Sequence, residues 1–132
     1  MKTVNLEICV DSWYAHAPAG GMRLWYYGGS YRLTYKKYYK HKYLDPHEER
    51  YLSVDKFIME MINEAIGLLT QPCFIKLTIP EDSFIYKIMN KQVYVYWKRN
   101  NWRYKDGRDV PKYWIEYECI INNAGHEVVL TE

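Results

Sequence analysis

Three acidic residues occupy positions from which carboxylates can act together. Asp11 directly follows the apolar, β-branched run Val4–Val10. Asp82 comes just after a second apolar run, Phe74–Ile79, and Glu60 lies early in a helical pattern. If both runs are neighbouring strands and the helix packs on their sheet, the three carboxylates meet at one end of that sheet. Such a cluster repels itself unless hard cations neutralise it. Mg2+ or Mn2+ suits oxygen ligands and can activate water and stabilise a phosphoryl transition state.

The same residues have a plainer interpretation. Asp11 and Asp82 can be turn residues or helix caps, and Glu60 can belong to a solvated helix face. Phe57 and Met61 bring the apolar stripe of the helix close to Glu60, where a carboxylate needs a partner. Spacing by itself leaves both interpretations open.

The elements that must position these residues follow an α/β pattern. We expect the first strand to end at Asp11 and a loop to follow at Ala17–Gly21. Gly28-Gly29 predicts a two-residue hairpin turn, after which the partner strand runs on to Tyr43. The remaining expected elements are a helix over residues 54–69 capped by Ser53, a central strand over 73–79 covered on both faces, a short helix over 83–89, a basic loop over 97–109, a helix over 111–121 and a strand over 128–130.

In order and spacing, these motifs resemble type 1 ribonuclease H, the magnesium-dependent nuclease that cuts RNA in RNA–DNA hybrids. The matching segments are Glu7–Ser12 for the opening strand with its aspartate, Ala17–Gly21 for the Pro-Gly-rich loop, Glu60–Leu69 for the helix with the metal-binding glutamate, Glu81–Ser83 for the Thr-Asp-Ser motif, and Trp97–Arg103 with Val110–Trp114 for the basic protrusion and the helix after it. The resemblance covers nearly the whole chain.

The resemblance implies a ribonuclease H-like α/β fold in a single domain over residues 1–132. This means a five-stranded mixed sheet with the strand order typical of the family and helices on both faces. The final C-terminal helix is expected to be absent, because the chain stops at Glu132. It also implies that Asp11, Glu60 and Asp82 are catalytic residues and ligands of Mg2+ or Mn2+, and that the substrate is an RNA–DNA hybrid.

Some residues depart from the family pattern. Ser12-Trp13 stands where the family has a glycine after its aspartate, and Val54–Lys56 replaces a Thr-Asn-Asn that helps to hold nucleic acid. His126 precedes the last expected strand, so the family's catalytic histidine is not assigned to it. These departures leave a second hypothesis open, that of a weakened or inactive ribonuclease H-like module that binds nucleic acid or protein.

Basic and aromatic residues alternate over Lys91–Lys112, here named the handle segment. Cations bind phosphates without regard to sequence, and aromatic rings stack on sugars or bases. The expected nucleic-acid-binding residues are Trp97, Lys98, Arg99, Trp102, Arg103 and Lys105. The alternative is a solvated loop whose tryptophans pack inward.

A second surface rich in Tyr and Lys extends from Tyr31 to Tyr43. It is either an edge strand guarded by lysines against aggregation or a contact surface for nucleic acid or a protein partner. His41 and His47 flank a turn, where we expect them to be solvated.

Composition excludes several classes of protein. The 132 residues carry 18 Lys and Arg against 16 Asp and Glu, so an anion-binding face must come from local clustering. No apolar stretch approaches the roughly 18 to 20 residues of a membrane helix, and no signal peptide is apparent, so we expect a cytoplasmic protein that does not bind a membrane. Cys9, Cys73 and Cys119 show no metal-binding spacing, and we expect reduced, buried thiols.

Overall fold

The computed structural model describes residues 1–16, 24–35, 38–44 and 54–131, and for 11–16, 24–28, 35 and 38–44 it gives the backbone alone. The expected loop Ala17–Gly21, the cap Ser53, His47 and Glu132 therefore lie outside the described residues. In chain order the elements are β1 (Lys2–His16), β2 (Leu24–Tyr35), β3 (Tyr38–Leu44), α1 (Val54–Gly67), β4 (Cys73–Thr78), α2 (Phe84–Asn90), α3 (Val93–Arg99), α4 (Lys112–Ala124) and β5 (Glu127–Leu130).

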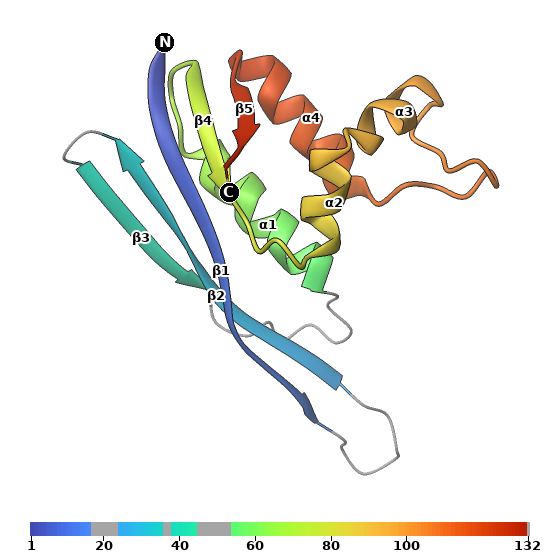
Figure 1. Ribbon diagram of the computed structural model, residues 1–132, viewed down its shortest axis with the longest axis horizontal. Helices are drawn as coiled ribbons and strands as arrows, with labels where there is room; N and C mark the ends of the chain where they lie inside the picture. Colours follow the sequence, from blue (N-terminus) through green and yellow to red (C-terminus); the bar gives the residue numbers. More distant parts are fainter. Residues whose placement is uncertain (17–23, 36–37, 45–53, 132) are drawn as a thin grey trace.

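The strands form one mixed sheet in the order β3-β2-β1-β4-β5 (Figure 1). β1 pairs antiparallel with β2, and β2 pairs antiparallel with β3. β4 lies parallel to β1 on one side and to β5 on the other. Because β1 and β4 run in the same direction, the end of β4 lies beside the middle of β1, where their ladder stops at the pair Glu7 and Thr78.

The described helices cover one face of this sheet, so the expectation of helices on both faces is wrong for the part of the chain described. Val4, Leu6 and Ile8 of β1 are buried, whereas Asn5 and Glu7 between them are exposed. β4 alternates in the same way, since Cys73, Ile75 and Leu77 are buried and Lys76 is exposed. Polar side chains at alternate positions can face solvent. The expected central strand, β4, is therefore buried on one face of the sheet only.

The core lies between this sheet and α1. Helix α4 packs against α1. α1 buries residues at helical spacing, namely Phe57, Ile58, Met59, Met61, Ile62, Ala65 and Ile66. Asn63 of α1 donates a hydrogen bond from Nδ2 to the carbonyl oxygen of Tyr113 in α4 at 3.1 Å. The width of the apolar stripe explains why this helix is buried on more than one side.

Gly28-Gly29 is not a hairpin turn, because both residues lie inside β2. Gly29 is opposite Val10, and a Cβ atom at this position would overlap the carbonyl oxygen of Cys9 and lie 3.2 Å from the ring of Phe57. The glycine is therefore explained by the close approach of a neighbouring strand and of α1. The actual connection from β2 to β3 falls at residues 36–37, outside the described residues.

The cysteines differ from the expectation in their exposure. All three are free thiols, but Cys9 and Cys119 are exposed and only Cys73 is buried. Cys9 is at an outward position of β1 and Cys119 at an outward position of α4, where apolar sequence context alone does not decide the direction of a side chain. None of the described helices is long and apolar enough to cross a membrane.

Candidate nuclease site and nucleic-acid interface

The first candidate carboxylate lies at an irregularity of β1. This strand does not end at Asp11, as the sequence suggested, but pairs with β2 as far as His16. The register shifts between Val10, opposite Gly29, and Ser12, opposite Gly28, so Asp11 is the extra residue of a β-bulge. The parallel ladder to β4 has its last pair at Glu7 and Thr78, so beyond this pair β1 continues with β2 as its partner.

The position of Asp82 matches that of Asp11 across the parallel ladder. Asp11 comes four residues after Glu7, and Asp82 comes four residues after Thr78, the partner of Glu7. Both residues therefore lie past the same end of the β1–β4 ladder. Asp82 is exposed in the turn before α2, whose N-cap Ser83 accepts a hydrogen bond from the backbone N–H of Tyr86 and donates one from its hydroxyl to the carbonyl oxygen of Pro80.

Helix α1 carries the third carboxylate to this end of the sheet. Phe57 packs over Gly29 beside the bulge, and Glu60 follows one turn later, about 5 Å along the helix axis. The loop after β4 passes the first half of α1, and α1 contacts α2 (Figure 1). Glu60 is half-buried, and its Oε1 lies 3.9 Å from Nζ of Lys56, which is the partner that its place near the apolar stripe required.

The described side chains do not by themselves form a complete metal site. Within residues whose side chains are described, no group of three or more His, Cys, Asp and Glu is placed to hold a metal ion. The Asp11 side chain lies outside that set. The backbone topology thus brings the three predicted positions to one end of the sheet. Of the three side chains, those of Glu60 and Asp82 are described.

The handle segment consists of α3 and an extended loop, whereas the sequence predicted a loop after Trp97 and assigned no helix there. Asn101 and Trp102 follow α3 in the left-handed region, with φ of 56° and 59°. The Trp102 N–H donates to the carbonyl oxygen of Trp97 at 2.6 Å, and the Trp102 carbonyl accepts from the N–H of Val110 at 3.0 Å. A left-handed conformation is uncommon for a bulky residue, and these bonds hold it in place.

Aromatic rings fasten the handle segment to α4. Trp114 of α4 is buried, and Tyr94 stacks on it with ring centroids 5.7 Å apart. Trp97 contacts both Trp114, at 5.9 Å, and Tyr104, at 5.3 Å, and is half-buried. The alternative in which the tryptophans pack inward therefore holds in part for Trp97, because its ring packs between the handle segment and α4.

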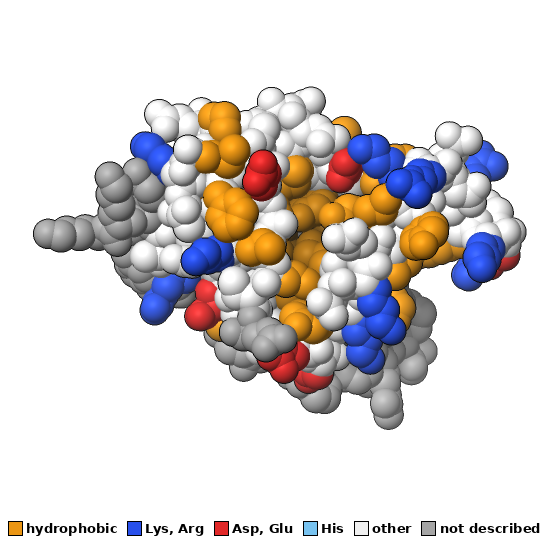
Figure 2. Space-filling view, turned by 45° about the horizontal axis from the view of Figure 1, so that its top comes forward, with side chains coloured by type: hydrophobic (Ala, Val, Ile, Leu, Met, Phe, Trp, Pro, Cys, Tyr) orange, Lys and Arg blue, Asp and Glu red, His pale blue; other side chains and the backbone are white. Residues whose placement is uncertain are grey.

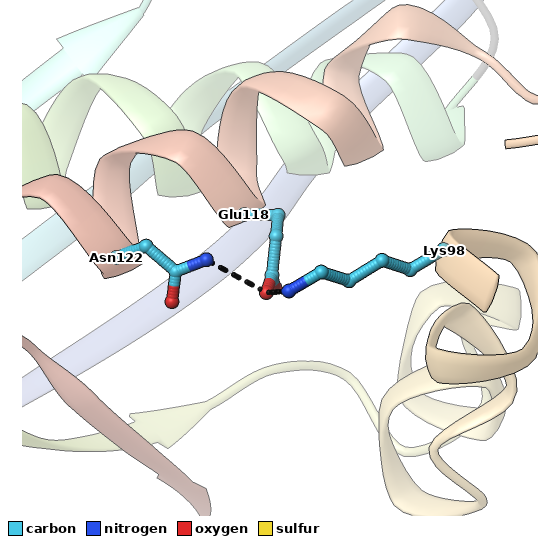
Figure 3. Close-up of polar contacts among 3 residues, drawn as sticks. All are labelled: Lys98, Glu118 and Asn122. Carbon is cyan, nitrogen blue, oxygen red and sulfur yellow. Dashed lines mark hydrogen bonds and ion pairs between the residues drawn. The ribbon is translucent and has the colours of Figure 1, made fainter. Parts of the chain in front are cut away.

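Lys98 contributes to the same attachment. Its Nζ lies 2.6 Å from Oε1 of Glu118 on α4, which also accepts a hydrogen bond from Nδ2 of Asn122 (Figure 3). The Glu118 side chain is mostly shielded, whereas that of Lys98 is half exposed. This ion pair neutralises the positive charge of Lys98, which we expected from the sequence to bind phosphate.

Other cations of the handle segment remain open to solvent. Arg99 and Lys105 are exposed, and no ion pair to either is found among the described residues. Arg103 lies 3.8 Å from Asp109 in a pair exposed on both sides. The backbone N–H and Nε of Arg108 donate to the Asp106 carboxylate and hold its pKa below the usual value. Figure 2 shows Lys and Arg side chains gathered on this lobe, at the right, beside a hollow lined by hydrophobic side chains.

Solved structures show the same chain fold. Neither a protein-family model nor a curated protein matches the sequence. A type 1 ribonuclease H with the type 2 active-site motif, LC9-RNase H1, superposes with a TM-score of 0.67 at 14% identity, over 99% of this chain and 63% of that chain. The foamy viral protease-reverse transcriptase in complex with double-stranded DNA gives a TM-score of 0.55 at 11% identity, over 99% and 81%. The chain has a ribonuclease H-like fold.

A second structure of the foamy viral enzyme, in complex with an RNA/DNA hybrid, gives a TM-score of 0.54 at 10% identity over 98% of this chain and 17% of that chain. At such identities the ribonuclease H-like fold is what the chains share. The resemblance inferred from ordered motifs is thus confirmed for the fold. The roles of the individual site residues stay predictions.

Sequence reasoning missed one residue of the ribonuclease H-like chain that the structure brings into view. Tyr96 is 70% exposed on α3 and lines a cavity beside the basic residues. Val93, Tyr96, Trp97 and Asn100 recur at helical spacing, and all four line this cavity. Residues 93–97 also fit the apolar pattern of a strand. The sequence pattern alone therefore did not show that these four residues share one face of a helix.

Proposed function

We propose that this chain is a metal-dependent endonuclease that cuts the RNA strand of RNA–DNA hybrids. The observation that carries the proposal is the placement of Asp11 and Asp82 at matching positions past the end of the β1–β4 ladder, with Glu60 on the helix packed beside them. This arrangement occurs on a ribonuclease H-like fold. The similar ribonuclease H, and a similar reverse transcriptase solved with an RNA/DNA hybrid, support the choice of reaction and substrate.

The residues fit a divalent metal ion by donor chemistry. Asp11, Glu60 and Asp82 offer carboxylate oxygens, the ligands that Mg2+ and Mn2+ prefer. Nζ of Lys56 lies 3.9 Å from Oε1 of Glu60, a distance that leaves the carboxylate able to bind an ion as well. A bound ion would supply activated water and stabilise negative charge on the phosphoryl group. The three carboxylates would hold the ion, and their places at the bulge of β1, after β4 and on α1 would orient the scissile phosphate against it.

The handle segment would bind the duplex backbone. Arg99, Arg103 and Lys105 present positive charge on a lobe that the Trp97 contacts and the Lys98 ion pair hold to α4. Such cations contact phosphates irrespective of sequence. Trp102, the remaining residue expected to bind nucleic acid, stabilises the turn after α3 through its backbone hydrogen bonds. Binding therefore depends on residues separate from the carboxylates that are assigned to hydrolysis.

The test is cleavage of an RNA–DNA hybrid in Mg2+ and in Mn2+ with matched carboxylate variants. Asp82→Asn should lower the cleavage rate at least about 100-fold, because it removes a charged ligand, whereas Glu81→Gln, the neighbouring exposed carboxylate, should leave it within about twofold. Glu60→Gln and Glu64→Gln, one turn apart on α1, form a second pair with the same expectation, and Asp11→Asn should behave as Asp82→Asn. Equal rates within both pairs would exclude the assigned site.

A non-catalytic binding module is the alternative that the structure supports with a separate observation. The exposed cations of the handle segment do not depend on the carboxylate end of the sheet. Salt-sensitive hybrid binding without turnover in either metal ion would favour this function. A protein contact through the Tyr- and Lys-rich strands is a further hypothesis, and most of those side chains lie outside the described set, although Tyr31 itself is buried.

A further inference from the structure

The handle segment contains a cavity as well as surface charge. It measures about 770 Å3 and is lined by Val93, Tyr96, Trp97, Asn100, Arg103, Tyr104 and Lys105. Small-molecule sites typically measure about 300 to 1,000 Å3. The cavity is therefore large enough for one nucleotide, whereas a duplex backbone requires an open track rather than a hollow of this size.

The walls of the cavity are held in place from outside it. Trp97 contacts Trp114 of the core at 5.9 Å, and the next residue, Lys98, forms its ion pair with Glu118 at 2.6 Å (Figure 3). Both contacts connect α3 to α4, so the residues on the cavity side of α3 need not move to form a site. Preorganised walls lower the entropic cost of binding.

Tyr96 offers the stacking surface. Trp97 and Tyr104 already contact one another at 5.3 Å, and the Arg108 guanidinium lies over the Tyr104 ring at 5.4 Å. Tyr96 is 70% exposed, and no ring contact to it is found within the described residues. An exposed aromatic ring at a cavity is a stacking platform for a base, which has a flat face of its own.

Polar groups complement the ring at the same cavity. Asn100 carries an amide able to donate to and accept from a base edge, and its Nδ2 donates to the carbonyl oxygen of Arg103 at 3.1 Å. Arg103 and Lys105 bring positive charge to the lining. An aromatic platform, an amide and two cations match the base, the base edge and the phosphate of a nucleotide.

We propose that this cavity holds the base of one unpaired nucleotide, so that the chain favours RNA–DNA hybrids that carry a single-stranded extension. The proposal rests on the proposed function, because it treats the handle segment as the nucleic-acid interface. It adds a site for a base at Tyr96 to the expected contacts with phosphates. A base in a continuous duplex is stacked between its neighbours and cannot enter the cavity without leaving the helix.

The test compares three hybrids: a blunt one, one with a four-thymidine extension at the 5′ end of the DNA strand, and one with the same extension at the 3′ end. Binding is measured by fluorescence anisotropy in EDTA, which prevents metal-dependent cleavage. The parent chain should bind at least one extended hybrid about 5- to 150-fold more tightly than the blunt one, the range expected for stacking of one base. Equal affinity for the blunt hybrid and both extended hybrids would overturn the proposal.

Two variants at one position isolate the ring. Tyr96→Ala should abolish the preference and leave the affinity for the blunt hybrid unchanged, whereas Tyr96→Phe keeps the ring and should retain the preference. Because Tyr96 is largely exposed, both variants should keep the melting temperature of the parent. A preference that survives Tyr96→Ala would also overturn the proposal.

Cleavage of the blunt hybrid in Mg2+ separates this proposal from the proposed function. Cleavage by Tyr96→Ala at the parent rate, together with a lost extension preference, supports both. Cleavage with no extension preference in the parent removes the base site alone. Extension preference without cleavage removes the nuclease and keeps the base site.

Discussion

His126 is a buried histidine whose hydrogen bond fixes its protonation state. It is 5% exposed, and its Nδ1 accepts the backbone N–H of Cys73 at 3.0 Å. An imidazole that accepts through Nδ1 carries its proton on Nε2, and protonation of Nδ1 would break this bond. Burial lowers the pKa of His126 below 6.5, its ordinary value. The residue therefore joins the start of β4 to the start of β5 in its neutral form, a structural role.

The protein should lose stability as the pH falls because of His126. The folded-state pKa is below the unfolded value, so the unfolded chain binds more protons and the contribution of His126 declines from about pH 6.5 downward to the folded-state pKa. Urea denaturation at pH 7.5 and at pH 5.0 measures this loss. His126→Asn keeps a side-chain acceptor and does not titrate, so it should show a smaller difference between the two pH values. An equal difference in parent and variant would assign the loss to other groups.

At the scale of elements, the β1–β2 ladder and α1 pack closely at the bulge. Gly29 lies between the Cys9 carbonyl oxygen and the Phe57 ring, at the point where Asp11 leaves the regular register. Backbone atoms cannot move aside as the end of a flexible side chain can. Phe57 of α1 takes part in this close approach, and Glu60 lies one turn after it.

A methyl group at Gly29 should therefore be costly. Gly29→Ala should destabilise the protein by about 1 to 3 kcal/mol through overpacking, and should reduce hybrid cleavage because it displaces α1. Gly67→Ala is the matched control, since nothing lies within 4 Å of a Cβ there and alanine favours a helix by up to about 1 kcal/mol. Thermal unfolding of both variants checks this. A stable Gly29→Ala protein would contradict the close approach.

For the whole molecule, the distribution of charge matters more than its sum. The formal net charge of +2 gives little general attraction to nucleic acid. The exposed cations of the handle segment lie on the helical side of the sheet, whereas Lys76 lies on the face that the described helices leave open. We therefore expect a duplex to be attracted through the exposed cations of the handle segment.

Hybrid binding should accordingly depend on salt through the handle segment. Arg99→Ala and Lys105→Ala should each lower the slope of log K against log salt by roughly 0.7 to 0.9, the value expected for one lost phosphate contact. Lys76→Ala should leave the slope unchanged, because this exposed lysine lies on the open face. Titrations at several salt concentrations in EDTA would measure the three slopes. A similar fall for Lys76→Ala would point to binding by the open face of the sheet.

The sequence by itself determined the features that repeat locally along the chain. Alternation over Val4–Val10 predicted a strand, and the apolar spacing from Phe57 to Ile66 predicted the long helix. These periods predicted an α/β chain, because strand and helix periods depend on near neighbours. The ribonuclease H-like fold itself was expected from the resemblance of several ordered motifs to that family, and the solved structures confirm it.

Only the tertiary structure decided the features that depend on residues far apart in the sequence. Lys98 forms its ion pair with Glu118, 20 residues away, and the ring of Trp97 packs on Trp114. Gly29 lies within β2, pressed against the carbonyl oxygen of Cys9, instead of forming a turn. The open face of the sheet and the exposure of Tyr96 were decided in the same way. Local periodicity tells which side of an element is apolar, whereas what lies opposite each side chain is determined by packing between elements.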